Sequence, residues 1–448
     1  MKDAAPASAG EIFRLTIPQL GLMLCHLCIS MTDIWVAGQL DSRVLASMGF
    51  ITQVSAMLML IISIVGSGCM ATVSQSLGAG LPLRAARYAG LIVGISFLTG
   101  CIVSIMGLAV LPLILQWGLV AEEIMPIVTV FAVVYALQIP FYYSMIMLNS
   151  VFRAHKLVWL PFATLVLVTV VNFIGSVGLG LGRWGLPDCG YAAVAWATFF
   201  SALLGFVCNL VLGLRKGILH RYSLGPWRWN RVAAPRLWRI GAPAALGNLA
   251  AQTGNVALLS LTANLAQGAI PAVAGITLGT RIMGFILFPL GALGMTVTIL
   301  VGHLLGGRQP DAACVLGRRC ALWSALVMAA AAVCIALLRE PAAALFNDDT
   351  ATIMQAGQFL LFACWVLPLQ AAGQMLTAVL AGAGSTRFIC IIGCASTWGV
   401  ALPVAWALSH FTDWGAGGIY AGMALGNLCA ALWTVRVFKQ RRWLRGQG

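Results

Sequence analysis

Residues Leu15 to Leu40 read LTIPQLGLMLCHLCISMTDIWVAGQL, an apolar run that contains a single carboxylate, Asp33. A run of about 20 apolar residues can cross the hydrocarbon core of a bilayer, roughly 30 Å thick, as one helix. At about 1.5 Å of rise per residue, a helix that enters near Glu11 places Asp33 about 30 Å further on, toward the opposite leaflet. Because an ionised Asp in lipid costs ~2.5–3.5 kcal/mol on insertion scales, we expect Asp33 to face protein or water.

This position gives Asp33 two interpretations. Intramembrane carboxylates often mark the path of an ion or a substrate, which makes Asp33 a candidate coupling group. Alternatively, Asp33 caps the end of its helix or pairs with a neighbouring charge such as Arg43. The residues Trp35 to Ala37 continue the apolar pattern beyond Asp33 and favour the first interpretation.

The composition places the whole chain in a membrane. Of its 448 residues, 61% are hydrophobic and only 8% are charged, which excludes an ordinary soluble protein. Apolar runs of 20 residues or more recur throughout, whereas a membrane β-barrel shows alternating runs of about ten. The sequence therefore predicts an all-α polytopic membrane protein. Breaks at charges, Gly and Pro predict twelve transmembrane helices, at 12–37, 46–77, 88–115, 123–148, 158–182, 189–214, 236–265, 271–305, 314–338, 350–380, 387–410 and 415–438.

The two halves of the chain resemble one another. A shift of 228 residues brings the break at Gly78 onto the break at Gly306. We predict an N-terminal six-helix lobe over residues 1–214, a basic cytoplasmic linker over 215–235, and a C-terminal six-helix lobe with a basic tail over 236–448. Because six is an even number, the lobes would share one orientation about a pseudo-two-fold axis along the membrane normal, with a site at their interface.

The charges predict the orientation in the membrane. The net charge is +14, and the basic residues fall in alternate breaks, which places both termini in the cytoplasm by the positive-inside rule. This pattern removes nucleic acid as a partner. The N-terminus lacks the layout of a cleaved signal, so we expect the first helix to remain as an anchor. The segment Arg215 to Arg239 combines Arg and Trp, which indicates a helix at the lipid interface.

Polar side chains inside the N-terminal spans are the candidate partners of Asp33. They are Asn149 at the end of the fourth span, Asn172 and Ser176 in the fifth, and Thr198 in the sixth. Asn172 and Ser176 are one helical turn apart and share a face, so both would point toward Asp33. Alternatively, each side chain is a hydrogen-bonding contact between helices.

Other residues in the spans are candidates for a hinge or for the lining of a central cavity. Pro18 removes one backbone hydrogen bond from the first helix and is the candidate hinge. Arg281 lies inside the eighth span, where it needs either a structural partner in its own half or a substrate. Met and aromatic side chains in spans more often pack than line a cavity. The candidate lining residues are Met31, Trp35, Tyr135, Gln252, Asn255, Arg281, Met283 and Phe285.

No catalytic or cofactor machinery is visible. HExxH, GxSxG and GxxxxGK[ST] are absent, so neither an enzyme nor an ATP-driven pump is expected. Cys25 and Cys28 form a CxxC within an apolar helix without a second pair, and no metal is expected there. Asp348 and Asp349 open the tenth span, where helix capping explains them.

Several stretches occur in an order that carries a family resemblance. They are VAGQLDSRVLASMG from Val36, VSQSLGAGLPLRAAR from Val73, VAGITLGTRI ending at Ile282, VGHLLGGRQPDAA from Val301 and LAGAGSTRF from Leu380. Together they resemble the MATE (multidrug and toxic compound extrusion) family of transporters over essentially all twelve spans. The resemblance implies two six-helix lobes that form a V around a central cavity. It also implies export of amphipathic, often cationic compounds in exchange for H⁺ or Na⁺.

The chain resembles the DinF-type branch of the family more than the NorM-type branch. The NorM-type branch has a Glu in the seventh span and an Asp in the tenth. Here the seventh span offers Ala251 or Gln252, and the tenth offers only Gln370 and Gln374.

The DinF-type site is built on the first-span Asp with polar partners in spans four to six. Asp33, Asn149 and Asn172 fit this pattern, whereas Ser176 stands where some members have a second acid. We expect protonation of Asp33 from the outer side to release the drug and to change the bend at Pro18.

The expected partners are a small amphipathic substrate and membrane lipid. The protein is expected as a monomer in the bacterial inner membrane, with no cofactor besides the transported ion. One alternative is a flippase for a lipid-linked oligosaccharide or another lipid, in which Arg281 would hold a pyrophosphate group. Another is a membrane-embedded enzyme, which would need paired acids or a nucleophile with a base.

Overall fold

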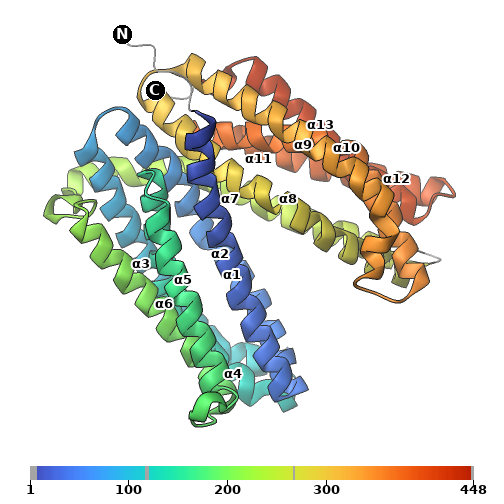
Figure 1. Cartoon of the computed structure of the whole chain (residues 1–448), viewed down its shortest axis with the longest axis horizontal. Helices are drawn as coiled ribbons and strands as arrows, with labels where there is room; N and C mark the ends of the chain where they lie inside the picture. Colours follow the sequence, from blue (N-terminus) through green and yellow to red (C-terminus); the bar gives the residue numbers. More distant parts are fainter. Residues whose placement is uncertain (1–7, 117–120, 266–267, 445–448) are drawn as a thin grey trace. The chain divides into compact units, whose positions relative to one another are not determined.

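Helices account for most of the computed structural model, which describes residues 8–116, 121–265 and 268–444 (Figure 1). The α-helices are α1 (Ala9–Leu40), α2 (Ser42–Gly78), α3 (Pro82–Gln116), α4 (Met125–Ala154), α5 (Trp159–Phe173), α6 (Gly190–Arg215), α7 (Trp227–Ala263), α8 (Ala269–Gly306), α9 (Pro310–Ala344), α10 (Thr350–Gly382), α11 (Thr386–Ser396), α12 (Leu402–Phe411) and α13 (Ala416–Lys439). Two π-helical stretches, η2 (Ile174–Leu179) and η5 (Thr397–Ala401), continue α5 and α11. Short 3₁₀ turns are η1 (Glu122–Ile124), η3 (Arg183–Gly185), η4 (Arg221–Ser223) and η6 (Arg442–Leu444).

Eleven helical stretches within the described ranges are long and apolar enough to cross a membrane, which confirms a multi-pass membrane protein. Thr386–Phe411 is one of these stretches, because α11, η5 and α12 follow one another without a break. The helix of the seventh predicted span, α7, is not among the eleven. It begins at Trp227 rather than near residue 236, and its first turns carry four arginines. The hydropathy of its apolar part is lowered further by Asn248, Gln252 and Asn255.

The chain packs as two compact units. One unit is Ile17–Gly241. The other combines Ala242–Gly448 with the chain up to Thr16. The division crosses α1 and α7, so each of these two helices belongs partly to both units.

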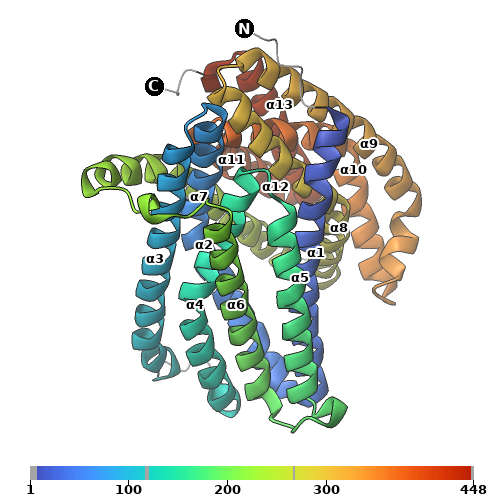
Figure 2. The ribbon, with the colours of Figure 1, turned by 60° about the vertical axis from the view of Figure 1, so that its left-hand side comes forward.

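In the unit Ile17–Gly241, the central helix is α4. It contacts α2, α3 and α6, and Figure 2 shows α3, α4 and α6 side by side. The core between these helices buries large apolar side chains such as Tyr143, Phe152 and Ile92 completely or nearly so. Lipid tails are as apolar as these side chains, so close van der Waals packing holds the helices together.

In the other unit, α10 has the corresponding position. It contacts α8, α9 and α13. The shift of 228 residues that relates the two halves of the sequence also places Pro140 of α4 onto Pro368 of α10. The internal resemblance of the sequence is therefore matched by a central helix at the same place in each unit.

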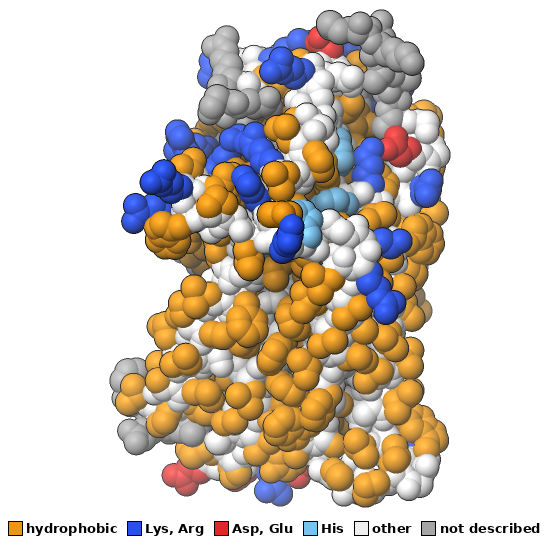
Figure 3. Space-filling view, turned by 90° about the vertical axis from the view of Figure 1, so that its left-hand side faces the viewer, with side chains coloured by type: hydrophobic (Ala, Val, Ile, Leu, Met, Phe, Trp, Pro, Cys, Tyr) orange, Lys and Arg blue, Asp and Glu red, His pale blue; other side chains and the backbone are white. Residues whose placement is uncertain are grey.

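The surface follows a membrane pattern on the face shown in Figure 3. Hydrophobic side chains cover its broad middle, and most of the visible Lys and Arg side chains gather in its upper part. An apolar surface of this extent marks contact with a membrane or a partner rather than with water.

Candidate functional site

Asp33 lies within α1 and is only 7% exposed. The helix continues to Leu40, so Asp33 does not cap its end. Arg43 pairs instead with Asp41, with 3.4 Å between Nε and Oδ2, on the exposed side of the connection to α2. The hydrogen bond from the backbone N–H of Arg43 lowers the pKa of Asp41, which caps α2. Neither alternative explanation of Asp33 is therefore realised.

Two hydroxyl groups donate hydrogen bonds to Asp33. Ser176 Oγ lies 3.2 Å from Asp33 Oδ1, and Thr198 Oγ1 lies 3.4 Å from Oδ2. Asn172 Nδ2 in turn donates to Thr198 Oγ1 over 3.2 Å. The structure thus brings three of the predicted partners into one cluster with Asp33, contributed by α5 with η2 and by α6.

These hydrogen bonds leave the carboxyl group incompletely satisfied. Thr198 has one hydroxyl proton, and the carbonyl oxygen of Val194, at 2.9 Å, competes with Asp33 for it. An ionised carboxylate has about four acceptor positions. Asn172 Oδ1 is also buried and has no hydrogen-bond partner among the described residues. A poorly solvated carboxylate with a spare amide oxygen in the same cluster favours uptake of a proton or of a small cation with oxygen ligands.

The end of α5 is shaped to bring this cluster together. Its hydrogen-bond ladder changes to the π-helical pattern at Ile174, two residues before Ser176, and such stretches are frequent at functional sites. Gly175 faces Ala197 of α6: a Cβ atom at Gly175 would lie 2.7 Å from Ala197 Cβ. Only glycine permits this close approach. The residues that follow Gly175 and Ala197 are Ser176 and Thr198, the two donors to Asp33.

The structure separates Asn149 from the cluster. Asn149 Oδ1 accepts a hydrogen bond of 2.7 Å from Asn209 Nδ2 of α6. By contrast, Tyr135, on the same helix as Asn149, lies near Asp33. Fourteen residues separate Tyr135 from Asn149, about 21 Å along α4. Asn209 is absent from the residues predicted from the sequence, although it lies eleven residues after Thr198 and so on the same face of α6.

Pro18 is buried within α1, beside the boundary between the two units. Just before it, Thr16 Oγ1 lies 2.9 Å from Thr296 Oγ1 of α8. Pro18 has no N–H group, so it cannot donate to the carbonyl group of Arg14 one turn earlier. The helix thus has one backbone hydrogen bond fewer next to the place where it passes from one unit to the other.

The candidate lining residues differ in exposure. Met31, Trp35 and Phe285 are exposed, and the guanidinium of Arg183 lies 5.6 Å from the centre of a Trp35 ring. Met283 is buried. Gln252, Asn255 and Arg281 are exposed. Arg281 makes no ion pair or hydrogen bond within the described ranges, so the structural partner expected in its own half is not found.

Asp349 confirms the capping interpretation of the NDDT sequence. Its side chain accepts hydrogen bonds from the backbone N–H groups of Ala351 and Thr352 at the start of α10. The Thr352 hydroxyl donates a further bond of 2.6 Å, and these bonds lower the pKa of Asp349. No group of three or more His, Cys, Asp or Glu side chains suited to a metal ion occurs in the part of the chain that the structure describes.

Long apolar helices with a buried carboxyl group inside one helix bundle are a pattern found in membrane transporters. Residues 18–177 and 243–407, which together make up more than half of the chain, match the family model MatE. The chain therefore belongs to the MATE family, whose members are transporters, as the resemblance predicted. The two matches fall in the two halves of the chain, in agreement with the internal repeat.

Known relatives extend over most of the chain. YisQ of Bacillus subtilis (strain 168), described as an uncharacterized transporter, is 22% identical over 438 residues, which cover 97% of this chain and 95% of the relative. YoeA of the same organism, a probable multidrug resistance protein, is 24% identical over 366 residues, which cover 80% of this chain and 77% of the relative.

Among solved structures, the Vibrio cholerae MATE transporter VcmN in its bent form matches with a TM-score of 0.87 and 21% identity, over 98% of this chain and 97% of VcmN. This match confirms the predicted all-α fold of twelve helices in two lobes.

Proposed function

We propose that this protein exports amphipathic, cationic drugs or metabolites across a bacterial inner membrane in exchange for protons, with Asp33 as the coupling group. The observation that carries the proposal is the buried Asp33 held by the hydroxyl groups of Ser176 and Thr198. A relative named as a probable multidrug resistance protein supports the substrate class. The assignment to the DinF-type branch rests on the same cluster.

The coupling step uses the two protonation states of Asp33. The ionised carboxylate accepts hydrogen bonds from both hydroxyl groups and attracts a cationic drug. Protonation removes the charge and turns the carboxyl group into a donor, for which Asn172 Oδ1 is a free acceptor in the same cluster. The cation then loses its counter-charge and leaves.

One exchanged ion supplies enough energy for useful export. One charge that moves through 100 mV contributes about 2.3 kcal/mol. At about 1.4 kcal/mol per tenfold change, this energy sustains a concentration ratio of about fifty.

Pro18 serves as the hinge in this proposal. The missing hydrogen bond at Pro18 lets α1 bend between Thr16, which is tied to Thr296, and the helix turns that carry Asp33. A bend there moves the carboxyl group relative to its hydroxyl donors. The exposed Met31 and Trp35, on the same helix as Asp33, would contact the substrate. Both termini lie in the cytoplasm, and the transporter acts as a monomer.

An efflux assay with the purified, reconstituted protein tests the proposal. Ethidium transport is followed in vesicles under a pH gradient, under a Na⁺ gradient and under none. We expect transport under the pH gradient, and its loss in Asp33→Asn. Asp413→Asn is the matched control, because Asp413 is an exposed carboxyl group in a loop.

Full pH-driven transport by a well-folded Asp33→Asn variant would refute Asp33 as the coupling group. Transport driven only by Na⁺ would leave Asp33 as the coupling group and identify Na⁺ instead of H⁺ as the coupling ion. Hydroxyl, amide and carboxylate oxygens also suit a hard cation.

Arg281 supports a second candidate, a flippase for a lipid-linked oligosaccharide. It is an exposed cation inside a membrane helix, without an ion pair in the described part of the chain. Such a cation would suit the pyrophosphate group of a lipid-linked sugar. This candidate predicts transfer of a lipid-linked substrate that Arg281→Gln abolishes, and no ethidium transport under any gradient.

A further inference from the structure

The first half of α7, Trp227–Gly241, is an amphipathic helix outside the carboxyl cluster. One face is buried: Ala233 and Leu237 belong to the core between α2, α3 and α4. The opposite face combines exposed apolar and basic side chains. Trp227, Val232 and Trp238 are 70%, 74% and 63% exposed, and Arg228, Arg231, Arg236 and Arg239 are exposed as well.

Close contacts fix this helix in place. A Cβ atom at Gly241 would overlap the carbonyl oxygen of Ile64 on α2. At the other end, Trp229 packs edge to face on Tyr88 of α3, with 5.0 Å between ring centres. The first half of α7 is therefore packed against α2 at one end and against α3 at the other.

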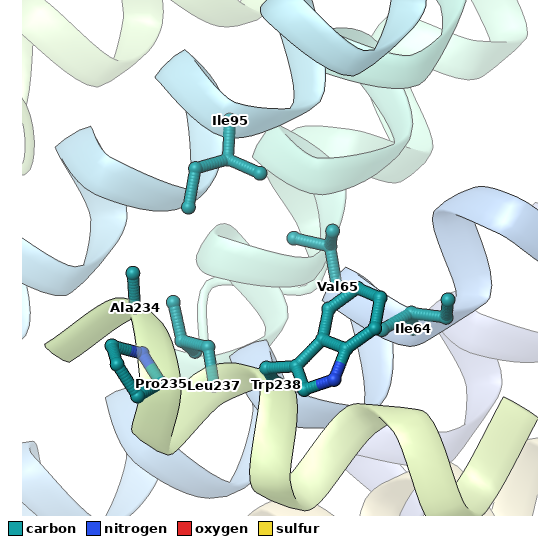
Figure 4. Close-up of a pocket in the computed structure, with 7 residues that line it drawn as sticks. All are labelled: Ile64, Val65, Ile95, Ala234, Pro235, Leu237 and Trp238. Atoms are coloured by element: carbon teal, nitrogen blue, oxygen red, sulfur yellow. The ribbon is translucent and has the colours of Figure 1, made fainter.

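A cavity of about 450 Å³ lies between the first half of α7 and the helices α2 and α3 (Figure 4). Its volume falls within the range of small-molecule sites. Every side chain that lines it is apolar apart from the indole N–H of one tryptophan. The lining residues are Ile64 and Val65 of α2, Ile95 of α3, and Ala234, Pro235, Leu237 and Trp238 of α7.

Basic residues precede the lining residues along α7, and the helices that form the cavity hold no carboxylate to neutralise them. Arg231 lies on the same helical face as Ala234 and Trp238, one turn before the first and two turns before the second. Arg228 shares a face with Pro235, two turns further along α7. The guanidinium of Arg231 lies 5.5 Å from the centre of the Trp227 ring. No Asp or Glu occurs between Asp41 and Glu122 or between Asp188 and Asp311, so α2, α3 and α7 contribute only positive charge.

An apolar cavity beside uncompensated arginines, on a helix with exposed tryptophans, has the chemistry of a lipid site. Basic clusters on amphipathic helices bind anionic lipid headgroups, and Trp side chains favour the headgroup level of a bilayer. A soluble anion would leave the apolar cavity without a partner.

We propose that the cavity between α2, α3 and α7 binds one anionic phospholipid, with an acyl chain against Ile95 and Trp238 and the phosphate at Arg228 and Arg231. The site is independent of the export proposal, because it lies within one unit and involves none of the carboxyl cluster. It adds a lipid ligand that bridges the basic helix and the core helices.

Native mass spectrometry of the full-length protein in detergent tests this proposal. Phosphatidylglycerol is titrated, and phosphatidylcholine with the same chains and sodium phosphate are the comparison ligands. We expect phosphatidylglycerol to bind more tightly than phosphatidylcholine. The Arg228→Gln/Arg231→Gln variant should bind phosphatidylglycerol about 30-fold more weakly, at ~1 kcal/mol for each arginine.

Two further variants keep the test selective. Arg318→Gln/Arg319→Gln removes the same charge from exposed positions of α9 and should bind phosphatidylglycerol as the wild type does. Val65→Phe fills the cavity without a change of charge and should also weaken phosphatidylglycerol binding. Gel filtration and the unfolding temperature establish that each variant is folded.

Three results would overturn the proposal. They are unchanged phosphatidylglycerol binding by the folded Arg228→Gln/Arg231→Gln variant, equal binding of the two lipids, and complete displacement of phosphatidylglycerol by sodium phosphate. The last result would identify a soluble anion as the ligand.

Discussion

The contact between Gly175 and Ala197 predicts the effect of one methyl group beside the carboxyl cluster. A Cβ atom at Gly175 would lie 2.7 Å from Ala197 Cβ, whereas apolar carbons rest about 3.5–4.0 Å apart. The Gly175→Ala substitution must therefore separate α5 from α6 by roughly 1 Å. The hydrogen bonds from Ser176 and Thr198 to Asp33 are already 3.2 and 3.4 Å long. Ser176 and Thr198 lie on the two sides of this contact, so a displacement of ~1 Å, shared between the two bonds or borne by one, carries at least one of them beyond hydrogen-bonding distance.

We expect Gly175→Ala to lower stability and coupling together. Overpacking of this kind costs about 1–3 kcal/mol. The assays are thermal unfolding of the detergent-solubilised protein and pH-driven ethidium transport in vesicles. Gly94→Ala is the matched control, because it makes the same change inside α3 where no atom lies within 4 Å of the new Cβ. The control separates overpacking from the higher helix propensity of alanine.

A second substitution tests whether the contact between Gly175 and Ala197 causes the loss. Ala197→Gly removes the methyl group that the new Cβ meets, so Gly175→Ala/Ala197→Gly should recover most of the lost stability and transport. If Gly175→Ala behaves like Gly94→Ala, or if Ala197→Gly brings no recovery, the contact does not position the cluster.

Two other predictions concern hydrogen bonds away from Asp33. Asn149→Leu should cost about 1–3 kcal/mol of unfolding free energy, because it leaves the buried amide of Asn209 without its partner. Asn149→Leu/Asn209→Leu should cost less than the sum of the single variants, and additive losses would contradict the pairing. Asp349→Asn should lower the unfolding temperature at neutral pH. The pKa of Asp349 is lower in the folded protein than in the unfolded chain. Its stabilisation is therefore complete above the unfolded value of about 3.9 and disappears as the pH falls through the folded value. The gap between wild type and Asp349→Asn should close in acid, and a constant gap down to pH ~2 would contradict this origin.

The sequence predicts the helices well because the bilayer imposes their length. A span needs about 20 apolar residues whatever it packs against, so the twelve spans follow from the hydropathy pattern. The prediction is weakest for α7. There, the basic interfacial segment from Trp227 continues into the membrane helix without a break, and neither charge nor hydropathy marks a boundary within a continuous helix.

The cluster is predictable in part. Turn spacing places Asn172 and Ser176 on one face, and the structure has both in the cluster around Asp33. Asn149 shows the limit of this reasoning. Its depth depends on how far α4 extends, and it pairs with Asn209 instead. Polarity identifies side chains that need a partner, but the partner is set by the register between helices, which a single sequence does not contain.

The π-helical stretch Ile174–Leu179 also has a genetic consequence. A π-helical turn holds more residues than the 3.6 of an α-helical turn, so loss of one codon here can be absorbed by a return to the α-helical pattern. The helix on either side would keep its orientation, because a π-helical turn holds one residue more than the α-helical turn that replaces it. Asn172 precedes the stretch and would stay in the cluster, whereas the side chains within the stretch, Ser176 among them, would change direction. A protein with a single-codon deletion in this stretch would therefore still span the membrane, but its carboxyl cluster would be disrupted.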